Sequence, residues 1–133
     1  MLDPRVLIVL THLLAFADAR HLEVTVTSIT SGREHLATVS QTHAEHRAID
    51  IRSRGWPEKT KLELVAYLNK VVGHYGAIGY VSGKRRVIIY EKYAAAGEHF
   101  HIQVSRIVKP KNLKSGLHDL ATLVNSNSRK LKE

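Results

Sequence analysis

The chain has 133 residues, the length of a single domain, of which 44% are hydrophobic and 24% are charged. This balance is typical of a soluble globular protein and excludes an intrinsically disordered chain. The sequence contains no cysteine, which excludes disulfides, thiolate metal ligands and a cysteine nucleophile. Lys and Arg outnumber Asp and Glu by 20 to 12, and the resulting net charge of +8 favours polyanionic partners.

The first expected element is an amphipathic helix over residues 4–19. Asp3 followed by Pro4 is a typical helix start, with an N-cap and a favoured first helical residue. Charged and polar residues interrupt the apolar run, so it fits neither a membrane span nor a secretory signal peptide. We therefore expect a protein made in the cytoplasm. The residues expected on the buried helix face are Val6, Leu7, Leu10, Leu13, Leu14 and Ala17.

The middle of the chain predicts two strands separated by a long loop. Residues 22–29 alternate and are rich in β-branched side chains, which indicates a strand. Residues 30–46 are polar and include Gly32, which predicts a loop. Loops of this length in a compact domain are usually functional. Residues 47–52 predict a second, short strand.

A second helix is expected up to about residue 72, opened either by Pro57 or by a capping box of Thr60 and Glu63. Two further strands, 78–81 and 86–91, predict a hairpin around a Ser-Gly turn, and 99–104 predicts the last strand. The residues expected on the buried face of the helix are Leu62, Val65, Leu68 and Val72.

The whole chain, 1–133, is expected to form one domain with a basic C-terminal tail from about residue 110. The order of elements predicts an α+β fold, with a small, mostly antiparallel sheet, helices packed on one face and a functional site on the other. The tail is interpreted either as a contact for anionic polymers or as a solubilising terminus. One more helix is expected there, with Leu113, Leu117, Leu120 and Val124 in register.

Strand alternation suggests how some of the nine histidines could gather. His99 and His101 share one face of the last strand, and Asp50 occupies one face of the second strand. If these strands are neighbours, Asp50 and His101 converge, and His43 in the preceding loop reaches the same point. Two imidazoles and one carboxylate suit a catalytic zinc with a position left for water. The alternative is that Asp50 pairs with a neighbouring arginine and the histidines are structural.

The segment 40–51 resembles the first zinc motif of the M15 peptidases. This family contains D-Ala-D-Ala carboxypeptidases, dipeptidases and phage L-alanyl-D-glutamate endopeptidases, and it is related in fold to hedgehog domains. The family pattern is Ser-x-His-x-x-Gly-x-Ala-x-Asp, and His43, Ala48 and Asp50 occupy its His, Ala and Asp positions. His46 stands where the pattern has glycine, so either it adopts a glycine-like backbone conformation or the loop differs from that of the family.

Two further segments resemble the same family in the same order. Residues 98–101 resemble its second motif, in which an acid precedes the last zinc-binding histidine by three residues. Residues 27–33 are similar to a strand ending in the family's Ser-Gly-x-Arg turn.

The resemblance implies a role for each matching residue. His43, Asp50 and His101 are the implied zinc ligands, and Glu98 is the implied general base. Arg33 is implied as a catalytic residue that binds a substrate carboxylate or stabilises the anionic intermediate. The remaining expected substrate contacts are Ser40 and His99.

We therefore expect a monomeric zinc metallopeptidase that hydrolyses peptide bonds of bacterial peptidoglycan. It would be an endolysin-like bacteriophage endopeptidase or a carboxypeptidase, reaching the wall after release or as a virion component. Contact with anionic wall polymers is expected, and specific nucleic-acid binding is not. Two alternatives stay open: a basic nucleic-acid-binding module that uses Lys84, Arg85 and Arg86, and a non-catalytic member of the fold.

Overall fold

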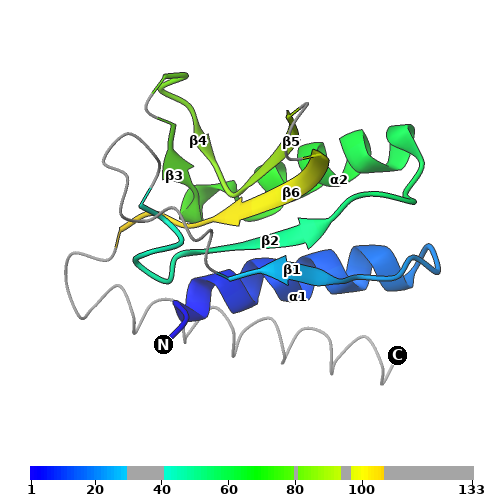
Figure 1. The fold of residues 1–133 in the computed structure, drawn as a ribbon, viewed down its shortest axis with the longest axis horizontal. Coiled ribbons are helices and arrows are strands. Elements are labelled where there is room, and N and C mark those ends of the chain that lie inside the picture. Colours follow the sequence, from blue (N-terminus) through cyan, green and yellow to red (C-terminus); the bar gives the residue numbers. More distant parts are fainter. Residues whose placement is uncertain (30–40, 80, 94–96, 107–133) are drawn as a thin grey trace.

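The protein is described by a computed structural model, which covers residues 1–29, 41–79, 81–93 and 97–106. It has an α+β fold with a four-stranded antiparallel sheet in the order β1-β2-β6-β5 (Figure 1), so the predicted class is confirmed. The helices are α1 (Pro4–Asp18) and α2 (Glu58–Val71), followed by the 3-10 turn η1 (Gly73–Tyr75). The strands are β1 (Val26–Ser28), β2 (Ala48–Arg52), β3 (Ala77–Ile78), β4 (Arg85–Arg86), β5 (Ile88–Tyr93) and β6 (Gly97–Gln103).

Helix α1 begins as the sequence predicts, and Val6, Leu13 and Ala17 are buried as expected, but part of the expected face is exposed. The Asp3 side chain accepts a hydrogen bond from the Arg5 backbone N–H, and Pro4 is the first helical residue. Leu7 and Leu14, which were expected in the core, are 43% and 45% exposed. Because this helix is apolar almost all the way round, spacing alone did not determine the buried face. The residues that it does bury are Arg5, Val6, Ile8, Val9, Leu13, Phe16 and Ala17.

Helix α2 starts after Pro57, with no side-chain capping hydrogen bond, so the capping-box alternative is wrong. Its buried residues are Lys61, Leu64 and Leu68, whereas Leu62 is 57% exposed. Leu68 and Val72 are buried as expected and Val65 packs against the core, so only Leu62 was wrongly placed. The core side of the helix also carries Lys61, which meets a carboxylate from β6.

The predicted hairpin is present but shorter than expected. Strand β3 pairs with β4 as a separate two-stranded sheet. The expected strand 86–91 is divided, because Arg86 pairs with Ala77 in the small sheet while Ile88 pairs with Ile102 in the large one. Strand β1 is also shorter than the expected 22–29.

The two faces of the main sheet differ in character. The helix-facing side chains of β2, β5 and β6 join residues of α1 and α2 in the core. Burying one such Ile or Phe side chain contributes about 1.5–3 kcal/mol. The opposite face carries polar residues of β2 and β6. The core residues from these strands are Ile49, Ile51, Ile88, Phe100 and Ile102.

Several expectations lie outside the described residues, namely the loop over 30–40 and the C-terminal tail with its helix. Among the described residues, no helix combines the length and apolarity needed to cross a membrane.

Candidate metal centre

Asp50 and His101 are brought together by the register of two antiparallel strands. Asp50 on β2 lies directly opposite His101 on β6, and Asp50 Oδ1 is 3.0 Å from His101 Nδ1. Both side chains project from the face opposite the helices, because Ile49 and Ile51 on β2 and Phe100 on β6 project toward the core. The convergence predicted from strand alternation is therefore present in the structure.

His43 reaches the same point from the turn that precedes β2. In this turn the Arg47 backbone N–H donates to the Thr42 carbonyl over 2.7 Å. His43 Nδ1 lies 2.8 Å from the carbonyl oxygen of Ile29, which can only accept, so this nitrogen carries the proton. His43 Nε2 then has a lone pair that could bind a metal ion, and it lies 3.3 Å from Asp50 Oδ1.

His46 gives this turn its shape. Its φ angle is 56°, in the left-handed region that favours glycine, as expected for the residue at the glycine position of the motif. Its carbonyl accepts a hydrogen bond of 2.9 Å from the backbone N–H of Asp3. The turn that carries His43 is therefore fastened to the start of α1.

The three side chains form a cluster that could hold a metal ion. One donor atom from each of His43, Asp50 and His101 lies within 4.8 Å of the other two. The two histidines are 6% and 7% exposed, so the cluster is largely withdrawn from water. Thr42 Oγ1 lies 3.4 Å from His101 Nε2 and supports the second imidazole.

The charge of the cluster is set by Asp50. Burial disfavours its ionised form, but the contacts with His101 and His43 outweigh this effect and hold the pKa of Asp50 well below its ordinary value. Asp50 therefore carries a negative charge between two imidazoles.

A second carboxylate–imidazole pair lies on the same face beside the cluster. Glu91 on β5 is opposite His99 on β6, with Glu91 Oε2 2.8 Å from His99 Nε2. His99 Nε2 is also 4.0 Å from Asp50 Oδ1. Sequence reasoning missed Glu91, because only the pairing of β5 with β6 places it there.

The structure does not bring Glu98 to the cluster. Glu98 is on the helix-facing side of β6, where Lys61 Nζ lies 2.7 Å from its Oε2 and the Tyr90 hydroxyl also donates to that oxygen. These two contacts lower the pKa of Glu98 to about 2. Glu98, the expected general base, therefore lies on the opposite face of the sheet from His43, Asp50 and His101. Residues three apart in a regular strand project from opposite faces.

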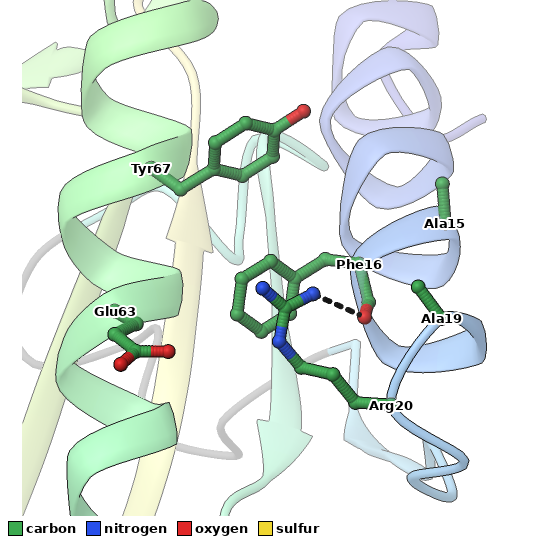
Figure 2. A pocket seen from close by; sticks show the side chains of 6 residues that line it. All are labelled: Ala15, Phe16, Ala19, Arg20, Glu63 and Tyr67. Atoms are coloured by element: carbon green, nitrogen blue, oxygen red, sulfur yellow. Dashed lines mark hydrogen bonds between the residues drawn. The ribbon is translucent and has the colours of Figure 1, made fainter.

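The expected substrate residues Arg33 and Ser40 lie outside the described residues. A separate cleft of about 480 Å³ lies between α1 and α2, and its lining includes Phe16, Arg20, Glu63 and Tyr67 (Figure 2). The Arg20 guanidinium stacks 3.5 Å above the Phe16 ring and donates to the Phe16 carbonyl. This cleft shares no residue with the His/Asp cluster.

The chain matches no protein-family model, and searches of curated proteins and of solved structures also find no match.

Proposed function

We propose that this protein is a zinc-dependent peptidase that hydrolyses peptide bonds of bacterial peptidoglycan. The observation that carries the proposal is the cluster of His43, Asp50 and His101 on the face of the sheet opposite α1 and α2. A half-buried carboxylate is held there between two imidazoles, on the face opposite the hydrophobic core.

The donor set favours zinc among the common protein metals. Imidazole suits zinc and other transition metals, while magnesium and calcium prefer oxygen ligands alone. Three protein ligands are the number found in catalytic zinc sites, which keep a fourth position for water or substrate. The hydrogen bond of His43 Nδ1 to Ile29 further supports this reading, because such contacts orient metal-binding imidazoles.

A bound zinc ion would polarise the scissile carbonyl and make water a stronger nucleophile near neutral pH. The protein must still supply a group that moves protons. Glu91 and His99 are the pair that fits this role, since they share the face of the cluster and His99 approaches Asp50. In this proposal the pair accepts the proton of the attacking water and returns it to the leaving amine.

The resemblance to the M15 peptidases gives the proposal its substrate class. Support comes from His46, whose positive φ fits the glycine position of the family motif. The net charge of +8 is compatible with binding to the anionic polymers of a bacterial cell wall.

The test is a digest of purified peptidoglycan, with and without a zinc chelator, read by mass spectrometry. Release of peptide fragments that stops on chelation and returns with zinc supports a metallopeptidase, and the fragment masses name the bond. The variant Asp50→Ala should release nothing, while His74→Ala, which changes an exposed histidine, should behave like the parent. If folded, zinc-loaded protein releases no fragment, the proposal fails. Salt-sensitive, chelator-insensitive binding to DNA would then favour the nucleic-acid alternative.

A further inference from the structure

Arg52 occupies the position next to the metal cluster on the same face of the sheet. It lies two residues after Asp50 on β2 and directly opposite His99 on β6. Because alternate residues of a strand share a face, Arg52 projects on the side of Asp50, about 7 Å further along the strand. Its backbone N–H is fixed by the Thr25 carbonyl at 2.9 Å, so the register at this position is secured.

The Arg52 guanidinium is not engaged in a structural contact within the described residues. Its side chain is exposed, and within the described ranges it has neither a hydrogen bond nor an ion pair. The two acids nearest to it in the strand ladder are engaged elsewhere. Asp50 is bound by His43 and His101, and Glu91 is bound by His99.

A second guanidinium lies at the same end of the sheet. A Cβ built on Gly97, the first residue of β6, would be 3.6 Å from the Arg54 guanidinium nitrogen. Tyr93 is opposite Gly97 on β5, and its ring centre is 6.3 Å from that of His99. This end of the face therefore combines two cations with an aromatic ring that is 56% exposed.

The other end of the same face is closed. Ala48 and Gln103 form the next pair on the far side of the cluster and are 0% and 6% exposed. The Gln103 amide donates 3.2 Å to the Arg86 carbonyl, so the β3–β4 hairpin covers it. Among the described residues, the exposed end of this face is therefore the side of Arg52.

From this arrangement we infer that Arg52, assisted by Arg54, binds a carboxylate of the substrate within about two residues of the scissile bond. The inference rests on the proposed peptidase function and specifies its substrate as an anionic peptide. The separation of about 7 Å between Asp50 and Arg52 equals the span of two residues in an extended peptide. A guanidinium presents two parallel N–H groups to a carboxylate, which gives both affinity and orientation.

The experiment compares three matched peptides: one with a free C-terminal carboxylate, one with an internal carboxylate and a C-terminal amide, and one with both groups amidated. Binding to the zinc-loaded protein is measured by calorimetry, and hydrolysis of the same peptides is measured separately. We expect the parent protein to bind at least one carboxylated peptide about tenfold or more tightly than the fully amidated one. The better of the two carboxylated peptides identifies the source of the group.

The variant Arg52→Ala should lose this preference, and Arg52→Lys should keep part of it. The matched control is Lys70→Ala, which removes a cation from the helix side and should leave the preference unchanged. Equal binding of all three peptides by the parent protein would overturn the inference, as would an undiminished preference in Arg52→Ala. Failure of the peptidase proposal would give a different result from failure of this inference, because carboxylate-dependent binding would then persist without any hydrolysis.

Discussion

Asp50 and His101 are direct cross-strand partners, and one oxygen of Asp50 lies 3.0 Å from His101 Nδ1 and 3.3 Å from His43 Nε2. Two strands and one turn therefore bring the three side chains together, with both imidazoles next to one oxygen of Asp50. The backbone register of the sheet fixes the Cα positions of two of these residues, Asp50 and His101, relative to each other. This gives the centre the rigidity that a metal site requires.

The first prediction concerns metal affinity. Replacing Asp50 by Ala should weaken zinc binding by more than about 100-fold, because loss of even a supporting residue typically weakens binding 10–100-fold. Zinc at 100 times its Kd should stabilise the parent protein by about 2.7 kcal/mol and the variant by far less. Competition with a chromophoric chelator and thermal unfolding with and without zinc provide the two measurements. Equal zinc affinity in parent and variant would remove Asp50 from the ligand set.

Much of this centre could be predicted from the sequence, because strand alternation has a period of two residues. The same period places His101 and Asp50 on the polar faces of their strands and Phe100 in the core. Applied to Glu98, it would also have placed that residue with Phe100, away from the cluster. The match to the family motif led to the opposite expectation, because it compared residue types and their order without considering which face of the strand each residue occupies.

Other features depend on contacts that no local pattern reveals. Lys61 is buried because it meets Glu98, which is 37 residues further along the chain. Glu91 becomes part of the site only through the pairing of β5 with β6. In α1, the apolar residues nearly surround the helix, so the face that meets the sheet is determined by tertiary packing.

The second prediction distinguishes two candidates for the general base: Glu98, implied by the sequence motif, and Glu91, proposed from the structure. Glu91→Gln should lower the rate of peptidoglycan hydrolysis by about 100-fold or more, since general-base catalysis typically contributes 10²–10⁴-fold. Zinc binding should be retained, because Glu91 is not among the three cluster residues. Glu98→Gln should keep both turnover and zinc. The reverse pattern, with activity lost only in Glu98→Gln, would restore the assignment made from the motif.

The third prediction is a pH dependence of stability that originates in the Glu98–Lys61 pair. The pKa of Glu98 is about 2 in the folded protein, below its ordinary value of 4.5, so the unfolded chain binds the proton more tightly. The stabilisation is therefore fully present above pH 4.5 and is lost as the pH falls toward 2.

Glu98 is 26% exposed, so solvent screening limits the contribution to the order of 1 kcal/mol. The free energy of unfolding of the parent and of Glu98→Gln should be measured in urea between about pH 6 and about pH 2.5, without added metal. The advantage of the parent should shrink across this range. A constant difference would show that the ion pair does not respond to protonation of Glu98.

The last prediction addresses the turn that holds His43. His46 has a φ angle of 56°, a conformation that costs most side chains about 1–2 kcal/mol and glycine almost nothing. His46→Gly should therefore leave the free energy of unfolding within about 0.5 kcal/mol of the parent, because relief of strain offsets the greater entropy of the unfolded chain. His46→Val should destabilise the protein by about 1–2 kcal/mol, since β-branched residues are especially unfavourable there. It should also weaken zinc binding, because the turn positions His43 next to Asp50. Urea unfolding and zinc titration of both variants test these expectations together. If the valine variant were as stable as the glycine variant, the turn would not require a left-handed residue, and the match to the glycine of the zinc motif would lose its physical basis.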